Sequence, residues 1–271
     1  MVIILSTFAA IALYMGGFIY HVRQLRTGSL FNPLILTAIA SVAMIAHTVT
    51  TIGALRHSGG LDLSLLNVIC LISLTINAMV FVSGLTKIQH SLYLILFPLS
   101  ALALALGSAI PSTKPVMLLS PDMQAHVLLS ILAYSFLAIA ALQALLIGLQ
   151  SWQLKHKRQN PLVTALPPLQ SMESLLFEII WVAEIFLTLS LISGFLFYDD
   201  FFAQKLLHKV VLSTLAWIFY AVLLIGRHVR GWRGHIATRL TWAGFICVLV
   251  GFIGSKFVLE FLIAQPPVIA L

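Results

Sequence analysis

The chain has 271 residues, of which 61% are hydrophobic and only 8% are charged, and its mean hydropathy is +1.07. A soluble domain carries about 25% charged residues, so this composition excludes a soluble globular protein and predicts an integral membrane protein in a lipid bilayer. The formal net charge of +7 is better explained by basic loops between membrane spans than by a surface that binds nucleic acid.

The predicted elements are all α-helical. A membrane-spanning helix needs about 20 mostly apolar residues, and eight segments meet this requirement. They cover residues 2–22, 32–55, 63–85, 89–110, 123–150, 173–197, 207–227 and 238–263. No loop is long enough to fold alone and no internal repeat divides the chain, so we predict one transmembrane helix bundle over residues 1–271.

Basic residues indicate how the spans are oriented. Ten of the arginines and lysines between spans fall on the loops after spans one, three, five and seven, and four fall on the opposite side. Because positively charged loops stay in the cytoplasm, this bias predicts that both termini lie on the outer, periplasmic side. The longest cytoplasmic connection, 151–172, contains a basic run and three prolines, and we predict a linker there.

Two histidines fall in the predicted outer half of the membrane. His47 lies in span two, and His126 begins span five in the stretch MQAHVLLSILAY. Ionisable groups inside a bilayer are costly and are candidates for function. Two imidazoles on neighbouring helices can approach one iron from opposite faces, and the alternative for each is a hydrogen bond to a neighbouring helix.

The seventh span carries a histidine at each end. His208 begins this span on the outer side, where it is either a partner for His126 or a wet interfacial residue. His228 ends the span at the cytoplasmic edge among arginines, where a loop cation near lipid headgroups is the alternative to a ligand.

Other polar residues within the spans suggest a different function. Asn67 and Asn77 are ten residues apart in span three, and Glu184 lies deep in span six. They are either interhelical hydrogen-bonding groups or the lining of a path for ions or protons. Lys256 and Glu260 are one turn apart in span eight and are interpreted as a structural pair. The sequence contains no P-loop and no GxSxG, HExxH or calcium-loop motif, so we expect no hydrolytic catalysis.

Three stretches together resemble the cytochrome c assembly membrane family, the CcsA/HemX-like haem-handling proteins. HVLLSILAY (126–134) is similar to a segment in which the family places an outward haem ligand. PPLQSMESLLFEIIWVAEIFLTLSLISGFLF (167–197) resembles the family's P-x-L-x-x-L-E-x-L stretch and the helix after it. LAWIFYAVLLIGRHVRGWRGH (215–235) is like its W-x-x-Y helix that leads to G-W-R-G.

The resemblance implies a multi-pass protein of the bacterial inner membrane that binds b-type haem. It implies His126 and His47 as ligands of the haem iron, with His208 or His228 as candidates for a second ligand. Cytochrome c synthases of the family carry a tryptophan-rich platform where this chain reads FYDDFFAQKLLHKVVLS. We therefore expect no synthase activity, but a role in haem delivery or as an accessory to a membrane protein partner. The alternative is an ion-transport protein with a polar path at Glu184, Asn67 and Asn77.

Overall fold

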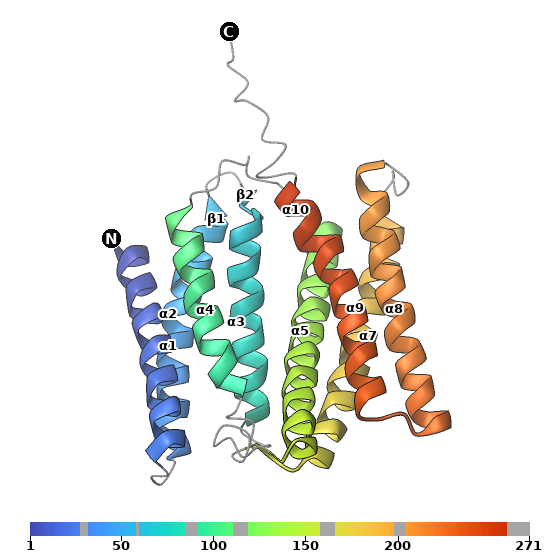
Figure 1. Ribbon diagram of the computed structural model, residues 1–271. Helices are drawn as coiled ribbons and strands as arrows, with labels where there is room; N and C mark the ends of the chain where they lie inside the picture. Colours follow the sequence, from blue (N-terminus) through green and yellow to red (C-terminus); the bar gives the residue numbers. More distant parts are fainter. Residues whose placement is uncertain are drawn as a thin grey trace.

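The computed structural model describes residues 1–27, 32–57, 60–84, 92–110, 119–157, 166–197 and 204–258. In these residues the protein is a bundle of long helices that run alternately up and down (Figure 1). The helices are α1 (Val2–Thr27), α2 (Pro33–Leu55), α3 (Leu65–Gly84), α4 (Tyr93–Ala109), α5 (Pro121–Lys155), α7 (Leu169–Phe197), α8 (Gln204–Arg230), α9 (His235–Leu249) and α10 (Ser255–Phe257). A π-helical turn, Val250–Gly254, joins α9 to α10. A small hairpin that the sequence did not predict, β1 (Arg56–His57) with β2 (Gly60–Leu61), precedes α3.

Each of the first seven predicted spans corresponds to one helix, with described ends that differ by a few residues. The eighth corresponds to α9, the π-helical turn and α10, and its predicted end at residue 263 lies outside the described residues. Among the described residues, seven helices are long and apolar enough to cross a membrane. The exception is α4, which has 17 residues and contains Pro98. At about 1.5 Å per residue it is about 25 Å long, somewhat shorter than a hydrocarbon core of about 30 Å. Of the predicted linker 151–172, the first residues belong to α5, which ends at Lys155, and the last belong to α7, which begins at Leu169. Residues 158–165 lie outside the described residues.

The described helix ends alternate between the two ends of the bundle. Both Met1 and α10 lie at the upper end of Figure 1, where α5 also begins. The α8–α9 connection lies at the lower end, together with the end of α5 at Lys155. The α8–α9 connection and the end of α5, both predicted to be cytoplasmic, therefore share one end of the bundle. The assignment of that end to the cytoplasm stays a prediction from the basic residues.

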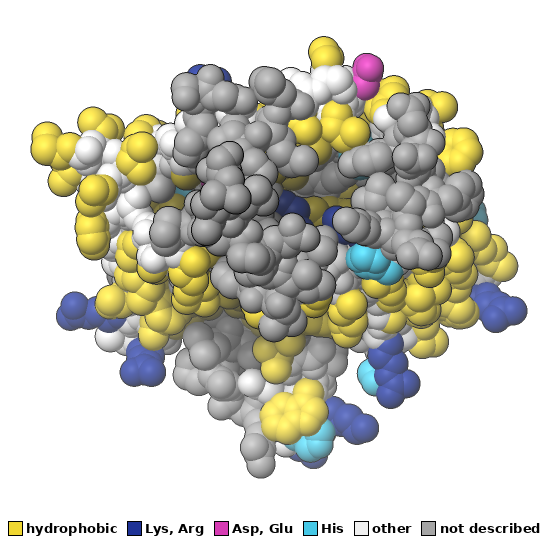
Figure 2. Space-filling view, turned by 90° about the horizontal axis from the view of Figure 1, so that it is seen from above, with side chains coloured by type: hydrophobic (Ala, Val, Ile, Leu, Met, Phe, Trp, Pro, Cys, Tyr) yellow, Lys and Arg dark blue, Asp and Glu magenta, His cyan; other side chains and the backbone are white. Residues whose placement is uncertain are grey.

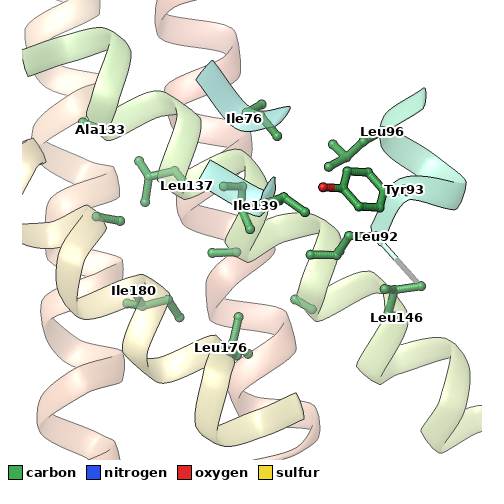
Figure 3. Close-up of a cluster of buried hydrophobic side chains, with 14 of the residues drawn as sticks. Ile76, Leu92, Tyr93, Leu96, Ala133, Leu137, Ile139, Leu146, Leu176 and Ile180 are labelled. Atoms are coloured by element: carbon green, nitrogen blue, oxygen red, sulfur yellow. The ribbon is translucent and has the colours of Figure 1, made fainter. Parts of the chain in front are cut away.

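The bundle has two halves, α1–α4 and α5 with α7–α10, and α5 packs against both (Figure 1). In Figure 3, Leu137 of α5 lies near Ile180 of α7, while Ile139 lies toward α3 and α4. In the most apolar window of α5, 61% of the residues are buried inside the protein, against 22% for α1. The central helix therefore holds the two halves together through apolar packing on both of its sides.

The outside of the bundle is apolar, as a lipid-facing surface must be. Large hydrophobic side chains such as Ile45, Trp181 and Ile225 are more than half exposed. Figure 2 shows yellow hydrophobic side chains around the perimeter of the upper end, with dark blue basic side chains both at the edge and near the centre. The perimeter is consistent with a multi-pass protein surrounded by lipid.

Candidate functional site

A cavity of about 520 Å³ opens in the upper part of the second half. We call it the His126 cavity. Its walls come from α5, α7, α8 and the C-terminal helix, with Leu63 and Val68 closing the side toward α3. Most of the lining is apolar, and the described lining residues include one imidazole, two lysines and several hydroxyls. A largely apolar cavity of this size with a few polar groups is typical of a site for a small molecule.

The His126 imidazole is hydrogen-bonded to a hydroxyl group of α7. Its Nδ1 is 2.9 Å from Ser193 Oγ, and that hydroxyl donates its proton to the Ser190 carbonyl at 3.0 Å. A serine hydroxyl has one proton. With that proton on the Ser190 carbonyl, Ser193 Oγ accepts a hydrogen bond from Nδ1–H of the imidazole. Nε2 then keeps the lone pair, which is the state that metal coordination requires.

A second hydroxyl pair fixes the helices that carry this histidine. Ser130 Oγ donates to the His126 carbonyl at 2.8 Å and lies 2.8 Å from Ser190 Oγ. The serines at positions 130 and 190 therefore connect α5 to α7 directly below the imidazole. Such interhelical hydrogen bonds contribute about 0.6 kcal/mol each inside a membrane, so they orient the helices more than they stabilise them.

The imidazole lies against the backbone of α7 at Gly194. A Cβ atom at position 194 would be 3.0 Å from His126 Cε1, closer than ordinary contact. Because residue 194 is glycine, the imidazole ring can lie directly against the backbone of α7 in the wall of the cavity. In the sequence, this glycine ends the L-T-x-x-x-x-x-G pattern of residues 187–194.

The other histidines lie elsewhere in the protein. His47 is fully buried in the first half, where Tyr14 of α1 lies 3.0 Å away, from Oη to Nδ1. Its Nε2 is buried near the backbone of Cys70 without a hydrogen bond of normal geometry. Among the described lining residues of the His126 cavity, none belongs to α1 or α2. In this part of the chain, the structure therefore does not bring His47 and His126 to one ligand. His208 and His228 are both exposed, at the upper and lower ends of α8.

The residues of the alternative polar path are also dispersed. Asn77 donates to Ser73 and Ser100 within the first half, and Asn67 lies within 3.4 Å of two backbone carbonyls near the hairpin. Glu184 lies in the second half, where both of its carboxyl oxygens are buried without a hydrogen-bond partner. Neither described cavity contains both Glu184 and either asparagine.

The three stretches that carry the family resemblance contact one another. Gly194 of the second stretch supports His126 of the first. Trp217 Nε1 of the third stretch donates to Thr188 Oγ1 of the second at 2.9 Å. At the lower end, Gly234 N donates to Glu173 Oε1 at 2.8 Å. Segments that are far apart in the sequence therefore meet along α7, the helix that forms the back of the cavity.

We call the contacts at the lower end the lower clasp. It consists of Glu173, Phe177, Gly226, Arg227, Trp232 and Gly234. The Trp232 ring packs so closely on Gly226 that a Cβ there would be 2.2 Å from it, and the Arg227 guanidinium lies 4.7 Å from the centre of the Phe177 ring. Gly234, which precedes α9, has a φ of +57°, a conformation that favours glycine.

Reasoning from sequence did not identify several residues of the cavity. Ser190, Ser193 and Lys209 were not candidates, and Lys256 was interpreted as the partner of Glu260, which lies outside the described residues. The signal for the serines was present as two hydroxyl residues one turn apart before Gly194. The sequence does not show which helix they face.

The family model described as "Cytochrome C assembly protein" matches residues 35–263. The inner membrane protein YpjD of Escherichia coli (strain K12) is 32% identical over 222 residues, or 81% of this chain and 84% of that protein. Protein HemX of Brevibacillus brevis is 26% identical over 131 residues, 48% of each chain. The cytochrome c biogenesis protein CcsA of Prochlorococcus marinus subsp. pastoris is 31% identical over 90 residues, or 32% of this chain and 29% of that protein. No solved structure matches the chain.

Proposed function

Because the chain belongs to the cytochrome c assembly protein family, we propose that this multi-pass inner-membrane protein binds haem in the His126 cavity, with His126 as an axial ligand of the iron. The single observation that carries the proposal is the imidazole itself. Its Nδ1 is hydrogen-bonded to Ser193, and its Nε2 is the nitrogen with a lone pair for a metal.

The surroundings of His126 suit a haem better than a bare metal ion. A metal site made only of protein groups needs three or four ligands. Among the described residues, no three His, Cys, Asp or Glu side chains lie close enough to hold a metal ion together. A porphyrin supplies its own nitrogen ligands, so one imidazole is sufficient, and the apolar cavity walls suit a flat apolar ring.

The chemistry of the chain favours haem b. Covalent attachment of haem uses a C-x-x-C-H motif, and the two cysteines of this chain, Cys70 and Cys247, lie in different helices. Bound haem would supply a redox-active iron. The chain would hold that iron through His126, orient the imidazole through Ser193 and exclude water with the apolar walls.

We propose a role in haem delivery, or as an accessory of another membrane protein, rather than catalysis. The stretch FYDDFFAQKLLHKVVLS contains no tryptophan, so it has no counterpart of the platform that the family resemblance associates with cytochrome c synthases. Asp199 and Asp200 in this stretch lie outside the described residues. Co-purification from native membranes under mild detergent would identify a partner.

The direct test is an absorption spectrum of the protein purified in detergent from haem-replete cells. We expect a Soret band and a reduced-minus-oxidised α band typical of haem b. If both bands are absent after haem is also supplied during purification, the protein does not bind haem and the proposal fails.

The close approach at Gly194 provides a more local prediction. A Gly194→Ala substitution places a methyl group 3.0 Å from His126 Cε1, so the imidazole ring must move away from the α7 backbone. We expect the apparent haem affinity to fall by about fivefold, or about 1 kcal/mol, in a spectroscopic haem titration.

Gly148→Ala in α5 is the matched control, because a Cβ there meets nothing within 4 Å. Both changes raise helix propensity by up to about 1 kcal/mol, so a difference in haem affinity reports the contact with His126. Equal affinities in the two variants would show that the position of this ring does not govern haem binding.

A second candidate function, ion or proton movement, rests on Glu184 alone. A buried carboxyl group without a partner is costly and is a functional candidate inside a membrane. The discriminating comparison is complementation of a deletion strain. Loss of complementation by Glu184→Gln but not by His126→Ala would favour transport, and the reverse would favour haem binding.

A further inference from the structure

A second cavity, of about 350 Å³, lies in the first half of the bundle. We call it the Thr51 cavity. It lies between the first turns of α1 and α3 and the last turns of α2 and α4, which come together at the upper end of Figure 1. None of its described lining residues also lines the His126 cavity, so a haem bound at His126 would leave this second cavity without an occupant.

One hydroxyl group in the lining of the Thr51 cavity has no hydrogen-bond partner. Thr50 Oγ1 donates to the Ala46 carbonyl at 3.1 Å, and Ser108 Oγ donates to the Ala105 carbonyl at 3.0 Å. Thr51 is only 1% exposed, and its Oγ1 has no such partner in the described part of the chain. Threonine in a helix takes two χ1 rotamers, so this hydroxyl can turn toward a ligand that offers an acceptor.

The amide of Asn67 is a second polar group of the lining with unused hydrogen-bonding capacity. Its side chain is 8% exposed. Its Nδ2 lies 3.4 Å from the carbonyl oxygens of Ala54 and Asp62, which is longer than the usual N–H···O distance. Within the described residues, its Oδ1 accepts no hydrogen bond. Thr51 of α2 and Asn67 of α3 therefore offer one donor and one acceptor to a molecule in the cavity.

The Thr51 cavity is neutral and borders the lipid. Its described lining residues include no acidic or basic side chain. On the side of α1 its wall contains Ile3, Ile4 and Phe8, which are 43%, 60% and 68% exposed. A charged group would be poorly solvated in such a place, so the lining favours a neutral, mostly apolar molecule that enters from the membrane.

We propose that the Thr51 cavity binds the head group of a membrane quinone. A quinone ring is flat and neutral and carries two carbonyl oxygens, and its apolar tail would remain in the lipid beside α1. The Thr51 hydroxyl would donate to one carbonyl oxygen, and Asn67 Oδ1 would accept from a hydroxyl of the reduced form. The volume lies within the range of about 300–1,000 Å³ that is usual for small-molecule sites.

A phospholipid matches the Thr51 cavity less well than a quinone. Its acyl chains suit the apolar wall, but its phosphate would meet no basic group among the described lining residues. A charge without a partner in apolar surroundings is costly. Binding of a lipid is therefore the alternative that an experiment must separate from binding of a quinone.

The test is photolabelling of the full-length protein, purified in detergent, with an azido derivative of decylubiquinone. We expect the label on the segments of α1, α2 and α3 that line the Thr51 cavity, identified by mass spectrometry of the peptides. A large excess of unlabelled decylubiquinone should prevent this labelling, whereas the same excess of dioleoylphosphatidylglycerol should not. The Thr51→Val variant loses one hydrogen bond to the ligand, so its half-saturating concentration of label should rise about fivefold.

Thr48→Val is the matched control on the same helix. Thr48 Oγ1 donates to the Met44 carbonyl at 2.8 Å, and Thr48 is not among the described lining residues. Both variants replace a hydroxyl group with a methyl group in α2, so a difference between them reports the contact in the cavity. Thr51→Ser keeps the hydroxyl group and should label almost as the parent protein does, which shows that a loss in Thr51→Val is not a folding defect.

Three outcomes would overturn the quinone site. The first is a label that spreads over the lipid-facing helices or that excess decylubiquinone does not remove. The second is equal competition by the phospholipid, which would make the Thr51 cavity a lipid site. The third is equal labelling of Thr51→Val and Thr48→Val. Each outcome is independent of haem, because His126 is not among the described residues that line this cavity.

Discussion

The protein with alanine in place of His126 is expected to lose its haem spectrum. His126 is the one histidine among the described lining residues of the cavity, so its removal leaves the iron without an axial imidazole from the protein. We expect haem occupancy after purification to fall at least about tenfold, which corresponds to about 1.4 kcal/mol of binding free energy. The measurement is the ratio of Soret to protein absorbance in equal preparations.

The removed imidazole also leaves space that a small molecule can fill. Added imidazole should therefore restore part of the Soret band in the alanine variant. His228→Ala is the matched control, because His228 is exposed at the lower end of α8 and its loss should leave the spectrum unchanged. Full haem occupancy in His126→Ala would exclude this residue as a ligand and would direct attention to His47.

The haem spectrum of a His47→Phe variant tests whether the buried histidine in the first half is a haem ligand. His47 contacts Tyr14 with an interplanar angle of 85° and a hydrogen-bond distance of 3.0 Å, an arrangement that packing alone explains. The spacing of His47 and His126 could not reveal that they lie in different halves, because hydropathy identifies helices and not their neighbours.

Most of the fold could be predicted from the sequence, because a membrane leaves few choices. Backbone groups in lipid must be hydrogen-bonded within helices, so long apolar runs become spanning helices. The π-helical turn at Val250–Gly254 was not predictable in this way. In this turn Gly251 lies against Leu212 of α8, and Ser255 Oγ donates to the Gly251 carbonyl. Neither contact leaves a periodic pattern in the sequence.

The candidate site was predictable only at its centre. The resemblance identified His126, but its partner Ser193 lies 67 residues away in the sequence. Lys256 illustrates the same limit. Its spacing predicts a pair with Glu260, which lies outside the described residues, and in the structure it reaches the Leu63 carbonyl, 193 residues away. Local spacing predicts contacts within one helix, and this cavity is made of contacts between helices.

The lower clasp lies at the opposite end of α7 from the cavity. A substitution in the clasp can therefore lower the stability of the fold without changing a residue of the cavity. Replacing Glu173 with alanine removes the acceptor for Gly234 N, which lies at the beginning of α9. This hydrogen bond is partly buried, so its loss costs about 0.5–1.5 kcal/mol, and an acidic group at a helix N-terminus contributes about 0.3–1 kcal/mol. We expect the midpoint of thermal unfolding in detergent to fall by several degrees.

The same change should loosen the α8–α9 connection locally. Trypsin cleaves after arginine, so cleavage at Arg230 and Arg233 on either side of Trp232 should become faster in Glu173→Ala. Glu173→Gln keeps a side-chain oxygen that can accept the bond from Gly234 N, so it should stay close to the parent protein in both measurements. Equal unfolding midpoints and cleavage rates in the alanine variant would show that the packing of Trp232 on Gly226 holds the connection without the hydrogen bond. A haem spectrum that is retained in Glu173→Ala but lost in His126→Ala would show that the lower end of α7 supports the fold and the upper end supports haem binding.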